Sequence, residues 1–249
     1  MSPDLELALD LADAADAIAL RLFRTGLAVE RKPDLTPVTE ADRAVEAELR
    51  RRLAAARPED GILGEEEGAS GSGARRWLLD PIDGTRNYAR GIPVWATLLA
   101  LEEEGEVRLG VVSAPALGRR WWAERGAGAF ANGARIRVSR VAAVEEAALS
   151  FACENGLPGL ARRAWHVRGF GDFWAHMLVA EGAVDGALDA AGVGEWDLAA
   201  VQAVVEEAGG RFSDAAGRRR LDGGTAVTSN GLLHEELLAA AAELRAGRA

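Results

Sequence analysis

The sequence predicts an α/β fold, in the form of layered α+β structure built from two successive halves. Segments with apolar residues at helical spacing alternate with short apolar runs of strand length, and no internal repeat relates them. Turn residues separate these segments. The chain has 249 residues, 49% of them hydrophobic and 27% charged, so it can bury a substantial core. We place the boundary between the halves after residue 143, which gives 1–143 and 144–249.

Two predicted helices open the first half. Gly26 can end the first of them, because glycine adopts the backbone conformation that closes a helix. Thr39 is a candidate N-cap for the second, and Asp42 three residues later completes a start that resembles a capping box. The predicted elements are a helix over 5–24, a helix over about 40–56 and a short strand at 62–63.

Strands dominate the rest of the first half. The apolar run before Asp80 suits a buried strand, and Pro81 is expected to end it because proline has no N–H to donate. Asn132-Gly133 predicts a tight turn. Residues 102–106 resemble a metal cluster, but a solvated hairpin turn is the favoured interpretation. The predicted strands cover 77–80, 94–101, 107–113, 121–123 and 129–130.

The second half alternates short strands with helices. Gly182 and the pair Gly209-Gly210 are expected to end two of the helices. The predicted strands cover 147–153, 165–168, 184–188 and 227–231, and the predicted helices cover 156–164, 173–181, 198–208 and 232–245.

Charge and cysteine content restrict the class of protein. The net charge of −10 argues against non-specific binding to nucleic acid. Cys153 is the single cysteine, so neither an internal disulfide nor a cysteine metal cage is expected. The first residues are acidic, and no apolar run approaches the length of a membrane span. We therefore expect a cytoplasmic protein with no nucleic-acid partner and no membrane association.

The most informative segment is WLLDPIDGTRNY at residues 77–88. Asp80 and Asp83 place two carboxylates three residues apart, and Gly84-Thr85 follows them at the start of a predicted helix. Carboxylates beside free backbone N–H groups can bring hard cations and a phosphate together. The chain has three histidines and no His-x-x-His pattern, which disfavours a zinc hydrolase. This layout is typical of metal-dependent phosphoryl transfer.

The segment DPIDGT at residues 80–85 resembles the signature of the inositol monophosphatase family. Three further segments follow the order used in that family: PVTEAD at 37–42, GEE at 64–66, and EWDLAA at 195–200, which leads to EAGG at 207–210. One segment alone could arise by chance, but four in order identify the chain as a member. The resemblance implies an αβαβα sandwich of two packed halves, a homodimer, and a small phosphate ester as substrate.

The resemblance also implies a site for two or three Mg²⁺ ions. Its implied ligands are Glu65, Asp80, the backbone carbonyl of Ile82, Asp83 and Asp197, with Glu66 as an outer ligand of a third ion. Asp197 comes from the second half, so this site would form only when the halves pack together.

The implied catalytic residues are Glu65, Thr85 and Asp42. Asp42 and Thr85 would share a hydrogen bond and orient the attacking water, and Glu65 would accept its proton. Gly84 and Thr85 would offer backbone N–H groups to the phosphate.

Each acidic residue also has an ordinary structural explanation. Asp42 could be an acid favoured in the first turn of a helix, and Glu65 could be a surface residue. Asp80 could belong to a turn, and Asp197 could be the N-cap of the helix that follows it. Only the joint pattern favours the metal site over these alternatives.

The choice of substrate depends on Asp172. Inositol phosphatases usually have a small or hydroxylated residue here, whereas a carboxylate suits a substrate with a cationic amine or imidazolium. Asp189 is a second candidate substrate contact. Further segments over nearly the whole chain resemble the histidinol-phosphate phosphatase branch of the family, including residues 32–39, 90–96, 111–117, 119–123 and 228–234.

The resemblance to that branch implies hydrolysis of L-histidinol phosphate in histidine biosynthesis, without a covalent enzyme intermediate. Two alternatives remain open. One is an inositol-1-phosphate phosphatase or a phosphatase of broad specificity, and the other is a non-catalytic regulatory binding protein.

Overall fold

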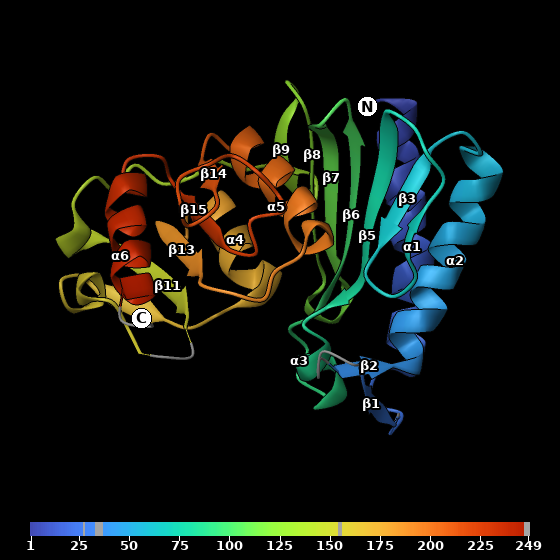
Figure 1. The fold of residues 1–249 in the computed structure, drawn as a ribbon, viewed down its shortest axis with the longest axis horizontal. Helices are drawn as coiled ribbons and strands as arrows, with labels where there is room; N and C mark the ends of the chain where they lie inside the picture. The colour runs from blue at the N-terminus through green and yellow to red at the C-terminus, as the bar shows by residue number, and fades with distance from the viewer. Residues whose placement is uncertain (27, 33–36, 154–155, 247–249) are drawn as a thin grey trace.

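The computed structural model describes residues 1–26, 28–32, 37–153 and 156–246. Residues 33–36, which belong to the segment 32–39 used above, lie outside the described residues. The structure confirms the layered fold: two helices, a large sheet, two helices, a smaller sheet and a last helix are stacked in that order (Figure 1). Short 3₁₀ turns occupy Pro115–Leu117, Val144–Glu146 and Gly159–Arg162.

The large sheet has eight strands, in the order β10-β9-β8-β7-β6-β5-β3-β4. All neighbours are antiparallel except β3 and β5, which are parallel. Their bounds are β3 (Gly61–Gly64), β4 (Gly68–Ser70), β5 (Arg75–Asp83), β6 (Ala96–Glu103), β7 (Glu106–Ala114), β8 (Arg119–Glu124), β9 (Gly128–Ala131) and β10 (Ala134–Arg135). A separate pair, β1 (Val29–Arg31) and β2 (Pro37–Thr39), precedes α2.

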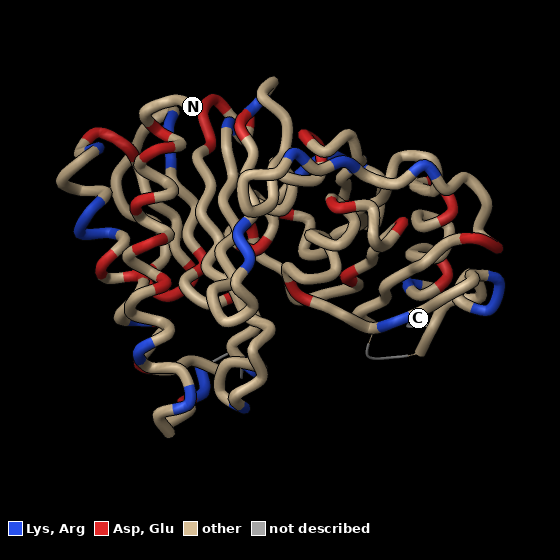
Figure 2. The backbone as a smooth tube through the Cα atoms, turned by 180° about the vertical axis from the view of Figure 1, so that it is seen from behind, with Lys and Arg blue, Asp and Glu red and all other residues tan. Residues whose placement is uncertain are grey.

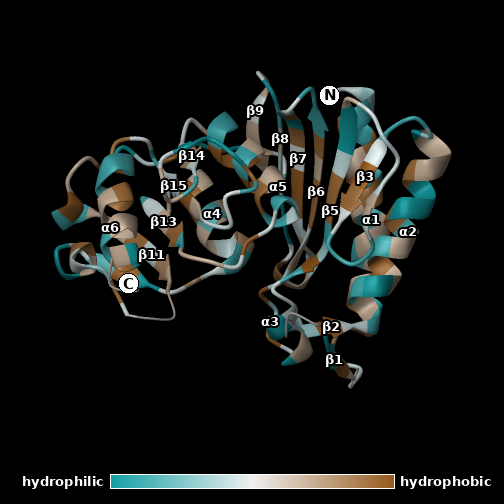
Figure 3. Ribbon diagram, in the orientation of Figure 1, coloured by the Kyte–Doolittle hydropathy of each residue, from teal (hydrophilic) through white to brown (hydrophobic). Residues whose placement is uncertain are grey.

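Both faces of the large sheet are buried, because apolar side chains alternate along its central strands. Trp77 and Leu79 face α1 (Pro3–Leu22) and α2 (Glu40–Ala56), whereas Leu78 faces the opposite helices, α4 (Asp172–Ala180) and α5 (Glu195–Glu207). Brown apolar segments along β5 to β7 mark this double-sided core (Figure 3).

The smaller sheet lies beyond α4 and α5, in the order β12-β11-β13-β15-β14. Helix α4 is apolar on two sides, and Val179 contacts Val184 and Ala187 of the smaller sheet region. The far face of this sheet packs against α6 (His234–Ala246). The strand bounds are β11 (Ala148–Ala152), β12 (His166–Arg168), β13 (Gly186–Asp189), β14 (Arg211–Ser213) and β15 (Ala226–Ser229).

Three local expectations were wrong. The helix expected over 156–164 is only a 3₁₀ turn over Gly159–Arg162. Strand β5 does not end at Pro81 but continues to Asp83, because a bulge sets three residue steps on β5 against two on β6. Helix α5 begins at Glu195, so Asp197 is its third residue and not its N-cap. Asp83 is therefore the last residue of β5, and Asp197 lies in the first turn of α5.

Every strand of the large sheet lies within residues 61–135, and every strand of the smaller sheet lies within residues 148–229. The middle helices α4 and α5 come from the second half of the chain but pack on the large sheet. Division after residue 143 stays a prediction, since these helices form one continuous core with the first half. Lys and Arg are interspersed with Asp and Glu over both halves of the described chain (Figure 2).

Candidate active site

The bulge in β5 shapes the centre of the candidate site. The Thr97 hydroxyl donates a hydrogen bond of 2.8 Å to the Pro81 carbonyl, which fixes the irregular stretch between the two acids of this strand. Gly84 then turns the chain into the short helix α3 (Thr85–Ala89) with φ at +82°. A Cβ there would lie 3.1 Å from the Val94 carbonyl oxygen, so this turn requires glycine.

Three carboxylates converge at the end of β5. Asp80, Asp83 and Asp197 each offer one oxygen, and these oxygens lie within 4.8 Å of one another. The Phe173 N–H, at the start of α4, donates to Asp83 Oδ2 at 2.6 Å, and the Gly194 N–H donates to Asp197 Oδ2 at 2.6 Å. Backbone of the second half therefore orients two of the three acids.

The three carboxylates are crowded together, and a bound cation would offset their mutual repulsion. Burial raises the pKa of Asp80 and of Asp83 well above the ordinary value, and neighbouring acids raise both further. Burial also raises the pKa of Asp197 to about 7. Asp80 Oδ1 is buried and has no hydrogen-bond partner among the described residues. Carboxylate oxygens in this state are the ligands that hard divalent cations prefer, so the residues present fit a metal site.

Glu65 and Glu66 directly follow β3, and both form ion pairs with the side chain of Lys32. Lys32 Nζ lies 2.8 Å from Glu65 Oε1 and 2.6 Å from Glu66 Oε1, and these two acids raise its pKa against the effect of burial. Burial raises the pKa of Glu66 to about 7. Sequence reasoning assigned no role to Lys32, because its contact with Glu65 spans 33 residues.

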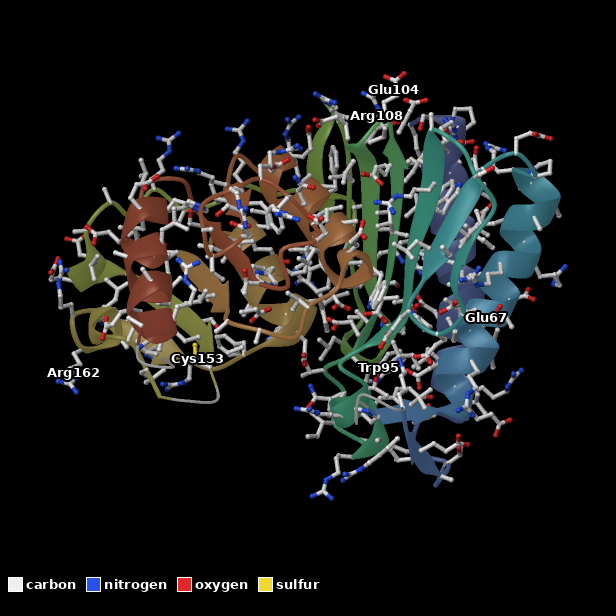
Figure 4. The ribbon with its side chains drawn as sticks, viewed as in Figure 1. Glu67, Trp95, Glu104, Arg108, Cys153 and Arg162 are labelled. Carbon is white, nitrogen blue, oxygen red and sulfur yellow. The ribbon has the colours of Figure 1, made fainter. Side chains whose placement is uncertain are left out.

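Glu46, which the sequence analysis also missed, is an acid that supports the turn at Glu66 and Glu67. Glu46 is fully buried in α2 and accepts hydrogen bonds from the Glu66 N–H at 2.8 Å and the Glu67 N–H at 3.0 Å. Arg50 also donates to it, at 2.8 Å. A Cβ at Gly64 would overlap Glu46 Oε1, which its hydrogen bonds hold in place, so glycine is required there. Figure 4 shows Glu67 beside α2. A glutamate on the buried face of a predicted helix was the available signal.

The predicted pair of Asp42 and Thr85 is brought together. Thr85 Oγ1 lies 3.2 Å from Asp42 Oδ1 and 3.0 Å from the Ile82 carbonyl oxygen, so its hydroxyl can donate to either. Asp42 is fully buried, and its other oxygen accepts from the Thr39 N–H at 2.7 Å and the Thr39 hydroxyl at 2.6 Å. The capping box is therefore present, and burial raises the pKa of Asp42.

Asp172 and Asp189 lie on the second-half side of the same site. Asp172 is the first residue of α4, has φ at +49°, and its Oδ2 would lie 3.4 Å from a Cβ on Gly84. Burial raises the pKa of Asp172, and the charge of Asp189 raises it further. Asn87 Nδ2 donates to the Val94 carbonyl at 2.9 Å and lies 3.5 Å from Asp172 Oδ2. A second acidic pair thus faces the carboxylate cluster.

Other predicted features lie away from this site. Glu102 and Glu103 belong to β6, and only Glu104-Gly105 forms the turn, with positive φ at both residues. Glu104 and Arg108 lie at the end of the large sheet opposite Trp95, which lies near α3 (Figure 4). None of these residues belongs to the carboxylate cluster of Asp80, Asp83 and Asp197.

A model of the inositol monophosphatase family matches residues 1–246. The chain belongs to this family. A histidinol-phosphatase of Mycobacterium tuberculosis is 53% identical over 94% of this chain and 96% of its own length. A histidinol-phosphatase of Streptomyces coelicolor is 48% identical over 94% of this chain and 95% of its own length. The solved structure of an IMPase of Thermotoga maritima superposes with a TM-score of 0.91 at 33% identity and covers all of both chains.

Membership in the inositol monophosphatase family is consistent with the geometry already described. Phosphoric monoester hydrolysis is the activity of these relatives, and the DPIDGT segment that suggested the family forms the bulge and turn at the centre of the site. No helix in the described parts of the chain is both long enough and apolar enough to cross a membrane.

Proposed function

We propose that this chain is a metal-dependent phosphomonoesterase that hydrolyses L-histidinol phosphate to L-histidinol and phosphate. The observation that carries the proposal is the convergence of two acidic groups of different character. One group, around Asp80, fits divalent cations, and the other, Asp172 with Asp189, fits a cationic leaving group. The histidinol-phosphatases at 53% and 48% identity support the same substrate.

We propose Mg²⁺ as the metal, with two or three ions. The proposed ligands are Glu65, Asp80, the carbonyl oxygen of Ile82, Asp83 and Asp197, with Glu66 near a third position. When bound, the cations neutralise the phosphate and lower the pKa of a water molecule. Oxygen ligands without histidine or cysteine suit Mg²⁺.

The chain's own groups then orient the reactants. The Thr85 hydroxyl, which lies between Asp42 and the Ile82 carbonyl, is proposed to orient the attacking water, and Glu65 is proposed to accept its proton. Backbone N–H groups of Gly84 and Thr85 are proposed to bind the phosphate. In-line attack by water needs no covalent intermediate with the protein.

Substrate choice follows from charge. The histidinol moiety carries an amine and an imidazole, which can be cationic, whereas an inositol ring offers neutral hydroxyls. Two neighbouring carboxylates, of which Asp189 is buried, gain more from a cationic group than from a neutral one. This favours histidinol phosphate over the inositol-1-phosphate alternative, and the complete set of acidic residues disfavours a purely regulatory role.

Replacing Asp172 with Ser tests this proposal. We expect kcat/KM to fall about tenfold or more for L-histidinol phosphate and much less for inositol-1-phosphate, since one charge-assisted contact is lost. Asp222→Asn, which changes an exposed acid paired with Arg220, is the matched control. Equal losses on both substrates would contradict the assignment of Asp172. A homodimer, a cytoplasmic location and the absence of nucleic-acid partners stay predictions.

A further inference from the structure

His176 is a buried histidine with a partner on each ring nitrogen. It lies on α4 and is 1% exposed. Its Nδ1 lies 2.8 Å from the hydroxyl of Thr228 on β15, and its Nε2 lies 2.9 Å from Asp189 Oδ2 on β13. An ionised carboxylate only accepts hydrogen bonds, so Nε2 donates to Asp189. The ring is thereby held between the middle helices and the smaller sheet.

The second carboxylate oxygen of Asp189, Oδ1, is available to bind a ligand. Asp189 is buried at the end of β13, and its Oδ1 has no hydrogen-bond partner among the described residues. Asp189 contacts His176 of α4, the helix whose first residue is Asp172 and whose Phe173 N–H donates to Asp83. A buried carboxylate oxygen without a partner is costly unless a ligand supplies a donor.

We propose that His176 is a positioning residue that fixes the orientation of the Asp189 carboxylate, so that Oδ1 binds a cationic nitrogen of the leaving alcohol. This inference rests on the proposed function and adds a specificity determinant to it. Without the Nε2–H donor, Asp189 would have two unpartnered oxygens beside Asp172. The carboxylate would then no longer be fixed in the orientation that presents Oδ1 to the ligand, so binding of a cationic group would weaken.

Two substitutions of His176 distinguish the effect of its hydrogen bond to Asp189 from the effect of its packing. His176→Gln keeps an amide N–H that can reach Asp189, whereas His176→Leu fills similar space without a donor. The readouts are kcat and KM for L-histidinol phosphate and for inositol-1-phosphate, and inhibition by the product L-histidinol. Loss of a hydrogen bond to a buried charge predicts that His176→Leu raises KM and the inhibition constant of L-histidinol about tenfold or more. His176→Gln should recover most of this loss.

A double-mutant cycle tests whether His176 acts through Asp189. We expect Asp189→Asn combined with His176→Leu to bind L-histidinol no more weakly than Asp189→Asn alone. If the two losses are additive, or if His176→Leu lowers kcat/KM for both substrates equally, the inference is wrong. If His176→Leu does not fold, His176→Met, which also fills the space without a donor, is compared with His176→Gln instead. A wild-type enzyme with no preference for L-histidinol phosphate would instead overturn the proposed function itself.

Discussion

Replacement of Asp197 with Asn should stabilise the protein without metal while it abolishes the response to metal. At pH 8 the metal-free chain holds Asp197 beside Asp80 and Asp83, and each of these acids has a raised pKa. The substitution removes one of the crowded charges. The amide oxygen of Asn can still accept the hydrogen bond from the Gly194 N–H, so the start of α5 is preserved.

The size of this effect follows from the pKa of Asp197, which rises from 3.8 to about 7 on folding. A carboxyl with a higher pKa in the folded state binds its proton more tightly there, so stability is greatest below about pH 4 and decreases as the pH rises to about 7. Since one pKa unit corresponds to about 1.4 kcal/mol, the ionised group destabilises the metal-free fold by an amount on the order of 4 kcal/mol. For a chain of this length that corresponds to roughly 10 °C in Tm.

Thermal unfolding at pH 8, in EDTA and in excess Mg²⁺, measures both effects. We expect Asp197→Asn to unfold at a higher temperature than wild type in EDTA and to gain little from Mg²⁺, whereas wild type gains substantially. Asp222→Asn should match wild type in both conditions. A variant that is less stable than wild type in EDTA, or that gains as much from Mg²⁺, would refute the reasoning.

Two other substitutions test groups outside the metal ligands. Glu46→Gln should raise the Mg²⁺ concentration for half-maximal activity about tenfold, because the turn after Glu65 loses its charged acceptor, while Glu48→Gln on the same helix should change it little. A normal Mg²⁺ titration for Glu46→Gln would contradict this. Burial lowers the pKa of His234 from 6.5 to about 4, so wild type should lose up to about 3 kcal/mol of stability relative to His234→Asn as pH falls through this range. If the free energy of unfolding falls equally with pH in the two proteins, burial does not lower the pKa of His234, and the prediction is wrong.

Local patterns predicted the parts of the site that depend on neighbours in sequence. The capping box of Thr39 and Asp42 and the glycine turn at Gly84 follow from short-range rules, and both are present. The same rules failed at Pro81, because a bulge lets the strand continue where proline has no N–H to pair. A β-bulge depends on the partner strand, which the segment itself does not reveal.

The remaining site residues depend on long-range packing. The ordinary roles of Lys32 and His176 would be a surface cation and a core histidine. Their contacts with Glu65 and Asp189 exist only because the residue after β1 lies beside the end of β3 and because α4 packs against β13. The order of the layers brings these groups together, and single-sequence periodicity does not determine which polar side chains share one buried junction.

The most direct test of the central claim is phosphate release by the purified protein with Mg²⁺, with L-histidinol phosphate and inositol-1-phosphate compared at matched concentrations. The pair of Asp172 and Asp189 beside the carboxylate cluster predicts a strong preference in kcat/KM for L-histidinol phosphate. Equal turnover, or a preference for inositol-1-phosphate, would leave the metal chemistry intact and contradict the substrate assignment.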